Sequence, residues 1–272
     1  MLSLPDSGNM TTELKQAGNA MSEPSTIQLA SNPNIEMHDV GDGQRFAIVD
    51  DFLADPHELT ANVAAYAGTF VSNPMGHPSR GRDMSERELQ DIHRFIRSRL
   101  SRHFPFLRAG VLLKAFMSNV SLKPEELSVY HRMCHIDPRA RADYHTYAGV
   151  VYLFAKPELG GTAFYRWKAK DIAVRTFELA SRDHEAALRY LEKNTETYRK
   201  APEYMTRSNE IAELLQAVPA KFNRLVFYNG EIPHSGHITQ PQLLSSDPAK
   251  GRLTLNFFAA VKAKDAAAAA AE

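Results

Sequence analysis

Apolar residues recur at helical spacing in two segments near the start of the chain. From Ser85 to about His103 they return every three or four positions, which predicts an amphipathic helix with one buried side. The segment His57–Ala67 has the same spacing and follows Asp55–Pro56, a typical helix start. The segment Arg45–Val49, which precedes both, predicts a strand. Each apolar stripe must be buried, so we expect the helices to cover other elements.

The pattern changes after Leu107. Segments rich in Val, Tyr, Phe, Leu and Thr follow, punctuated by Gly and Pro, and they predict strands. Between about 168 and 218 the helical spacing returns, and Ile211, Leu214 and Leu215 belong to its last part. A helical insert of roughly 50 residues is long for a loop and indicates a functional cover. The predicted strands are 111–120, 127–137, 145–154, 162–167, 222–229 and 252–261.

The two ends of the chain differ from its middle. Residues 1–40 are polar without periodicity and predict a disordered tail, and residues 263–272 form a low-complexity, alanine-rich tail. We therefore expect one domain over residues 41–262, with the helical insert at about 168–218.

Charge and cysteine content limit the class of protein. Among the 272 residues, 32 Lys and Arg balance 32 Asp and Glu, so we expect neither a nucleic-acid nor a membrane-surface partner. No apolar run approaches the roughly 20 residues that span a bilayer. The single cysteine, Cys134, excludes an internal disulfide and fits a reducing compartment. We expect a cytoplasmic protein.

The tripeptide His135-Ile136-Asp137 ends one predicted strand. Residues two apart on a strand point the same way, so His135 and Asp137 can reach one metal ion while Ile136 faces away. One imidazole and one carboxylate are two of the three ligands in the facial triad of non-haem iron(II) oxygenases. Alone this is a weak signal, because a histidine on a strand is more often a hydrogen-bonded core residue.

The remaining parts of such a site follow along the chain. The run FYNGEIPHSGHI supplies a second imidazole, His234. In GRLTLNFFA, Arg252 and Thr254 share one face of a strand, where a guanidinium and a hydroxyl suit a carboxylate ligand. In YAGVVYLF, Tyr152 can donate its phenol to the same carboxylate. The structural alternatives are an ion-pair role for Arg252 and core packing for Tyr152 and Thr254.

The ordered set H-x-D, Y-x-G-x-x-Y-L, G-G-T-x-F, a distal His and R-x-T resembles the prolyl-hydroxylase-type branch of the iron(II)- and 2-oxoglutarate-dependent oxygenase superfamily. Within the superfamily it is most similar to a poorly characterised bacterial group with a comparable helical insert. The resemblance covers about 45–262 and implies a mainly β fold with flanking helices, a double-stranded β-helix or jelly roll with N-terminal helices. It implies that His135, Asp137 and His234 bind iron(II) and that Arg252, Tyr152 and Thr254 bind 2-oxoglutarate.

The activity implied by the resemblance is decarboxylation of 2-oxoglutarate to succinate, coupled to hydroxylation of an unactivated C–H bond. The expected substrate is an amino acid, a peptide or a small metabolite, and ascorbate is a candidate stimulant. The sequence leaves the substrate and the oligomeric state open.

Two departures from the family pattern leave alternatives. The spacing from His234 to Arg252 is long, which keeps His237 as an alternative distal ligand. The presence of Asp137 argues against the halogenase variant, in which a small residue frees a site for halide. A non-catalytic binding domain on the same fold and a cupin-like metalloenzyme are the competing functions. A cupin would have no need of Arg252 and Thr254.

Overall fold

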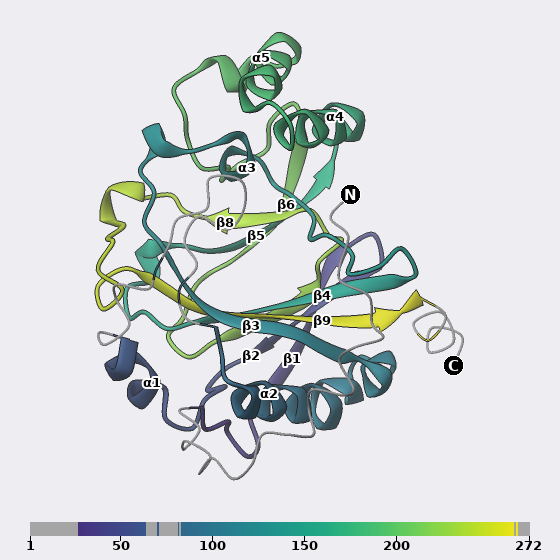
Figure 1. Cartoon of the computed structure of the whole chain (residues 1–272), viewed down its shortest axis with the longest axis vertical. Coiled ribbons are helices and arrows are strands. Elements are labelled where there is room, and N and C mark those ends of the chain that lie inside the picture. The colour runs from purple at the N-terminus through teal and green to yellow at the C-terminus, as the bar shows by residue number, and fades with distance from the viewer. Residues whose placement is uncertain (1–26, 64–69, 71–80, 82, 264, 266–272) are drawn as a thin grey trace, which may run out of the picture.

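Two β-sheets face each other at the centre of the molecule, and helices cover their outer sides (Figure 1). The computed structural model describes residues 27–63, 70, 81, 83–263 and 265. The larger sheet has six strands in the order β1-β2-β7-β4-β9-β3, and the smaller has three in the order β6-β5-β8. All strand pairs are antiparallel. The architecture is therefore mainly β with flanking helices, as the sequence predicts.

Most strands lie where the apolar pattern predicts them. The larger sheet consists of β1 (Ile35–Gly41), β2 (Gln44–Val49), β3 (Val111–Val120), β4 (Tyr144–Tyr152), β7 (Leu225–Asn229) and β9 (Arg252–Lys262). The smaller sheet consists of β5 (Gly161–Trp167), β6 (Ala212–Val218) and β8 (His234–His237).

The helices form an outer layer on each sheet (Figure 1). Helices α1 (Pro56–Val63) and α2 (Glu86–Ser98) pack on the larger sheet, and α3 (Val129–Arg132), α4 (Lys170–Ala180) and α5 (His184–Asn194) lie beside the smaller sheet. Short 3-10 turns occupy Leu100–Arg102, Pro105–Ala109, Pro124–Glu126, Pro157–Leu159, Thr197–Arg199 and Pro241–Leu243.

Helix α2 begins at a capping box. The Ser85 hydroxyl accepts a hydrogen bond from the Glu88 N–H, and the Glu88 carboxylate accepts one from the Ser85 N–H. Ile92 and Ile96, part of the predicted apolar stripe, are buried against the larger sheet. The N-terminal helix expected at His57–Ala67 reaches Val63 in the described part of the chain, and its remainder lies outside it.

Strand β9 separates the structural core from the site. Leu253, Leu255 and Phe257 point toward the helices and join the apolar cluster on that side. Arg252 and Thr254 are buried on the opposite face, which looks toward the smaller sheet. The alternation predicted for this strand is confirmed, and it directs the polar residues into the space between the sheets.

The expectation of a strand over 127–137 is wrong. After Ser128 the chain forms the short helix α3, whose first turn is capped by the Ser128 N–H donating to the His131 ring. Only His135 keeps an extended pairing, as an isolated bridge to His234. The hydrogen bond between Ser128 and His131 stabilises this helical turn, although Val129 and Tyr130 favour β-strands.

Two other expectations change because strands are defined by their partners. Ile211, Leu214 and Leu215 do not continue the helical insert, since β6 pairs with β5 over this region. Strand β1 falls almost entirely within the segment 1–40 expected to be a tail, and it pairs with β2 around a turn at Asp42 and Gly43. Residues 1–26, 264 and 266–272, which make up most of both expected tails, lie outside the described residues.

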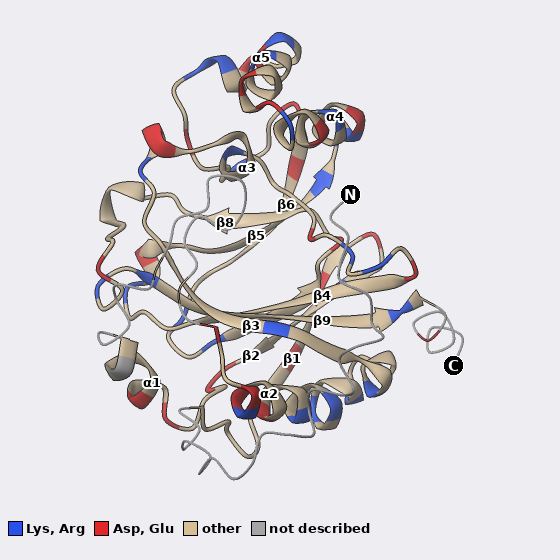
Figure 2. Ribbon diagram, viewed as in Figure 1, with Lys and Arg blue, Asp and Glu red and all other residues tan. Residues whose placement is uncertain are grey.

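Charged residues of both signs alternate along α2, α4 and α5, whereas the strands are largely uncharged (Figure 2). This mixture reflects the equal numbers of basic and acidic residues in the sequence. None of the helices in the described part of the chain is both long enough and apolar enough to cross a membrane.

An ion-pair cluster joins the end of β2 to the start of β7. Asp50 accepts hydrogen bonds from Arg224 Nε at 2.6 Å, from Arg224 Nη2 at 3.0 Å and from Lys221 Nζ at 2.8 Å. The Arg224 guanidinium, with help from Lys221, lowers the pKa of Asp50 from 3.8 to about 2. Because the folded-state pKa lies below the unfolded one, this stabilisation is complete above the unfolded value and is lost as the pH falls toward 2.

We expect Asp50→Asn to lower the free energy of unfolding at pH 7 by about 1 kcal/mol, because the cluster is partly exposed to solvent. The difference from wild type should shrink as the pH falls from 4 to 2, where the wild-type carboxylate becomes protonated. Urea unfolding at pH 7 and pH 3 measures both effects. Equal stability of the two proteins at pH 7 would show that the cluster contributes nothing.

Candidate metal centre

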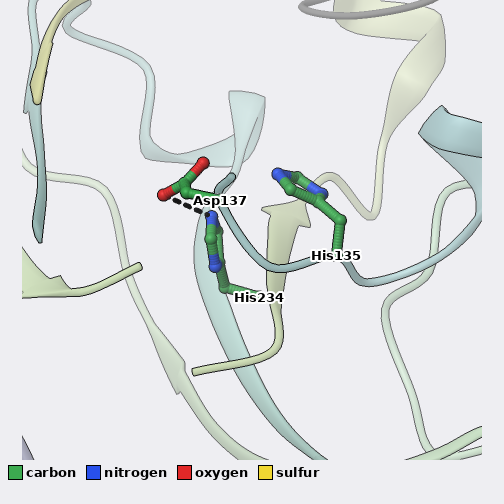
Figure 3. Close-up of side chains that lie close together, drawn as sticks. All are labelled: His135, Asp137 and His234. Atoms are coloured by element: carbon green, nitrogen blue, oxygen red, sulfur yellow. Dashed lines mark ion pairs between the residues drawn. The ribbon is translucent and has the colours of Figure 1, made fainter. Parts of the chain in front are cut away.

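Three side chains from two distant parts of the chain meet beside β8, the edge strand of the smaller sheet. His135, Asp137 and His234 each offer one ligand atom, and these atoms lie within 4.8 Å of one another (Figure 3). The backbone brings them together, because the His135 N–H donates to the His234 carbonyl at 2.9 Å and the His234 N–H donates to the His135 carbonyl at 2.8 Å. The predicted set of three ligands is therefore assembled in space.

Asp137 is held by the turn that follows β7. Its N–H donates to the Gly230 carbonyl at 2.7 Å, and the Gly230 N–H donates to the Thr146 carbonyl on β4 at 2.8 Å. Ile136 lies between His135 and Asp137 in the sequence, and its side chain, with 45% of its surface exposed, points away from them. His135 and Asp137 share a side as predicted, but separate backbone contacts place them rather than a continuous strand.

Both histidine rings are neutral at physiological pH. Burial lowers the pKa of His135 to about 4 and that of His234 to about 4. His234 Nδ1 lies 2.8 Å from the Ile232 carbonyl oxygen and donates its proton there. Its Nε2 lone pair then faces Asp137 Oδ2 at 3.6 Å. A neutral imidazole with a fixed, outward lone pair is the form that binds a metal ion.

The carboxylate of Asp137 requires a positive partner. Burial raises its pKa to about 6, and Oδ2 has no hydrogen-bond partner among the described residues. A buried oxygen without a partner is costly to the fold. Two nitrogen donors and one carboxylate oxygen on one side of a site fit a divalent first-row metal ion. The residues present therefore fit iron(II).

His237, the alternative distal ligand, is directed elsewhere. Its Nε2 lies 3.1 Å from the Thr206 carbonyl oxygen, and it is not one of the three residues whose ligand atoms converge. The structure thus selects His234 over His237 for the converging set.

Arg252 crosses the space between the sheets. Its Nε donates to the Gly160 carbonyl at 2.9 Å and its Nη2 to the Gly161 carbonyl at 2.8 Å, and its guanidinium carbon lies 5.9 Å from the Tyr152 and Phe154 ring centres. The residue is 5% exposed, and within the described ranges no Asp or Glu forms an ion pair with it. Burial lowers its pKa. A buried cation without a counter-charge is costly, and an anionic ligand would compensate it.

Tyr152 and Thr254 lie beside Arg252 on the same inner face, because they are directly paired across β4 and β9. The Tyr152 hydroxyl lies 2.7 Å from Thr162 Oγ1. Thr254 Oγ1 accepts a hydrogen bond from Asn256 Nδ2 at 2.9 Å, which leaves its own proton available to a ligand. The structure therefore gathers all three residues of the expected carboxylate site.

Tyr228 was not recognised in the sequence. Its ring packs edge-on against His234, with 4.8 Å between centroids and 67° between planes. Burial raises its pKa well above 10, with the negative charge of Asp137 acting in the same sense and the charge of Arg252 opposing it. Tyr228 therefore lies beside His234, in the apolar cluster that also contains Tyr152 and Phe154. The period-two alternation of the strand LVFYN places it on the inner face and was the available signal.

Gly230 was also not recognised, and its missing side chain makes room for Asp137. A Cβ added at Gly230 would lie 2.5 Å from Asp137 Oδ2 and 2.8 Å from Asp137 Cβ. We expect Gly230→Ala to displace the carboxylate and to weaken cobalt(II) binding at least about tenfold, measured by titration. Gly236→Ala is the matched control, since its Cβ would meet nothing closer than 3.5 Å. Wild-type affinity in Gly230→Ala would mean that Asp137 does not bind the metal.

Comparisons with known proteins add a family and weak structural similarity. The HygX structure from Streptomyces hygroscopicus with nickel, 2-oxoglutarate and hygromycin B bound covers 80% of this chain and 83% of its own, with 13% identity and a TM-score of 0.40. The alignment with the non-heme alpha ketoglutarate dependent epimerase SnoN from nogalamycin biosynthesis covers 80% of this chain and 79% of SnoN, with 13% identity and a TM-score of 0.38. The alignment with EctD from S. alaskensis with bound Fe covers 88% of this chain and 86% of EctD, with 14% identity and a TM-score of 0.38.

At these TM-scores the structural similarity decides neither the fold nor the activity of this chain. No curated protein sequence matches it. A family model matches residues 31–259, which is most of the chain and includes every residue of the site described above. The protein therefore belongs to the family of unknown function DUF6445.

Proposed function

We propose that this protein is an iron(II)- and 2-oxoglutarate-dependent oxygenase with a double-stranded β-helix core of the prolyl-hydroxylase type. One observation carries the proposal: among the described residues, a His-Asp-His cluster with an unpartnered carboxylate oxygen lies close to a buried arginine without a carboxylate partner. The Arg252 Nη2 would lie 3.8 Å from a Cβ added at Gly236, on the same short strand as His234. Each half needs a ligand of the opposite charge. A divalent metal ion together with a dicarboxylate satisfies both.

In this proposal His135, Asp137 and His234 would hold iron(II), and a set of three protein ligands would leave coordination positions for other molecules. The chemistry supplied by bound iron(II) is the activation of dioxygen at the expense of 2-oxoglutarate. The protein keeps both imidazoles neutral and fixes the His234 tautomer through the Ile232 carbonyl. These contacts define the ligand geometry before the metal binds.

Arg252 holds the distal carboxylate of 2-oxoglutarate. Its Nε and one Nη2 hydrogen are engaged with backbone carbonyls, which fixes the plane of the guanidinium and leaves Nη1 for the ligand. Thr254 contributes its hydroxyl proton, and Tyr152 packs against the guanidinium and adds a phenol to the same pocket. Tyr228 packs against the His234 ring and adds a buried aromatic wall beside this pocket.

The two competing functions predict different arrangements. A cupin-like metalloenzyme has no use for a buried arginine without a carboxylate partner, so Arg252 favours the oxygenase. A non-catalytic binding domain has no need to keep an open metal position. The proposed substrate is an amino acid, a peptide or a small metabolite, and ascorbate is proposed to support turnover by keeping the iron reduced.

Succinate formation tests the proposed reaction. Purified protein is incubated in air with iron(II), ascorbate and 2-oxoglutarate, alongside His135→Ala and the control His93→Ala, which lies on α2 beyond the larger sheet. We expect slow succinate formation in wild type and His93→Ala and none in His135→Ala. Absence of succinate in the wild type, together with absence of iron-dependent 2-oxoglutarate binding, would contradict the proposal.

A further inference from the structure

The chain between α5 and β6 returns to the metal centre and contacts the neighbours of two ligands. The Cys134 N–H donates to Met205 Sδ at 3.2 Å, and Cys134 directly precedes His135. Ser235, which directly follows His234, donates from its hydroxyl to the Met205 carbonyl at 3.1 Å. One residue of the insert is thus hydrogen-bonded to both ligand-bearing segments.

This network is buried and includes a third donor. The Tyr165 hydroxyl donates to the Met205 carbonyl at 2.8 Å and lies 3.2 Å from the Ser235 hydroxyl. Met205, Cys134, Tyr165 and Ser235 are all buried. Buried hydrogen bonds of this kind fix one geometry, because a broken bond leaves a polar group without water or partner.

The ligand segments need such support. Among the described residues and outside the Met205 network, the segment of His135 is joined to β8 by the isolated bridge between His135 and His234, and to the preceding turn by the hydrogen bond from the Asp137 N–H to the Gly230 carbonyl. Strand β8 itself spans only His234–His237. A single bridge does not fix the distance between two side chains as firmly as a continuous ladder does.

The neighbouring residues of the insert extend the contact to the other half of the site. Tyr204 is buried in the same apolar cluster as Tyr152 and Phe154, and its hydroxyl donates to the Leu122 carbonyl at 2.9 Å. Burial raises the pKa of the Tyr204 phenol, and the positive charge of Arg252 opposes this rise. The segment Tyr204–Met205 thus spans from the arginine pocket to the metal ligands.

A second attachment lies three residues before His135. Arg132 Nη2 donates to the Tyr198 carbonyl at 3.1 Å, and the Tyr198 hydroxyl donates to the Arg132 carbonyl at 3.1 Å. The guanidinium carbon of Arg132 also lies 5.3 Å from the centre of the Tyr198 ring. The insert is therefore fastened to the His135 segment at two points.

We propose that Met205 is a positioning residue that holds His135 and His234 at the separation needed for metal binding, and that the insert is a wall of the site rather than a removable cover. This inference rests on the proposed metal centre. It predicts that metal affinity depends on hydrogen bonds made by the insert, although no residue of the insert binds the metal.

Cobalt(II) titration tests the proposal without turnover. The double variant Tyr165→Phe/Ser235→Ala removes both donors to the Met205 carbonyl, and Met205→Leu removes the sulfur acceptor at similar volume. Tyr130→Phe is the control, because it removes a different insert hydrogen bond, to the Phe177 carbonyl at 3.5 Å. We expect at least tenfold weaker cobalt(II) binding and an altered visible spectrum in the double variant, a smaller loss in Met205→Leu, and less than twofold change in the control.

Hydrogen exchange of the metal-free protein gives an independent readout. In the double variant the amides of His135 and His234, which form the bridge, should exchange at least tenfold faster, with unchanged protection in β9. Met205→Leu serves for both measurements if the double variant does not fold. Wild-type affinity, spectrum and exchange in a folded variant would overturn the role of Met205. Failure of the wild type to bind cobalt(II) would instead overturn the metal centre, and this inference with it.

Discussion

Replacing Asp137 with alanine is expected to weaken iron(II) binding severely and, at the same time, to stabilise the metal-free protein. A variant without this ligand should bind iron(II) more than about a hundredfold more weakly, beyond the loss typical of residues that only support a ligand. The metal-free form should gain about 1 kcal/mol in free energy of unfolding, because the variant no longer buries a carboxylate oxygen that has no hydrogen-bond partner in the described part of the chain. Thermal unfolding with and without iron(II) measures both effects.

The opposite signs of these two effects separate a metal ligand from a structural aspartate. If Asp137 had only a structural role, its replacement would lower the stability of the protein whether or not metal is present. Asp137→Asn is the matched variant, since it keeps the shape and removes the charge, and it should also lose most of the metal-induced increase in Tm. Metal-induced stabilisation that survives in both variants would exclude Asp137 as a ligand.

Replacing Arg252 should leave iron binding intact and remove 2-oxoglutarate binding. Truncating one partner of a buried charge pair costs about 2–5 kcal/mol, so Arg252→Ala is expected to weaken 2-oxoglutarate binding roughly 30-fold to several thousandfold. Arg252→Lys keeps the charge but loses the planar fork that the carbonyls of Gly160 and Gly161 orient, so it should lie in between. Anaerobic titration of the iron-loaded variants measures these affinities.

Arg224→Ala is the control for this experiment, because Arg224 is a partly buried arginine that pairs with Asp50 at the end of β2. It should lose stability and keep its affinity for 2-oxoglutarate. If Arg252→Ala retains wild-type affinity for 2-oxoglutarate while it binds iron, the carboxylate site must lie elsewhere.

The sequence was sufficient to predict those parts of the fold that depend on local alternation. Strand β9 was predicted with the correct faces, since Leu253 and Leu255 are long apolar residues that alternate with Arg252 and Thr254. The same alternation predicted a strand that contains Tyr152, which in the structure lies opposite Thr254. Parity along one strand depends only on the chain itself, which is why these predictions hold.

The sequence was insufficient where distant contacts determine the structure. The segment around His135 was expected to be a strand, but it becomes a helix and a single bridge because Ser128 caps α3 and His234 supplies the pairing partner. Strand β6 was expected to be helical, since its pairing with β5 is not visible in its own pattern. The positions of Gly230 and Met205 beside the ligands likewise result from tertiary packing.

The visible absorption of the protein with iron(II) and 2-oxoglutarate under anaerobic conditions tests the proposed site most directly. The expected band requires 2-oxoglutarate to bind the same iron ion that the protein holds. We predict a weak charge-transfer band that appears only when both are present, is absent in His234→Ala, and needs far more 2-oxoglutarate in Arg252→Ala. Wild-type protein that binds iron(II) but shows no such band at saturating 2-oxoglutarate would contradict the assignment of this site to a 2-oxoglutarate-dependent oxygenase.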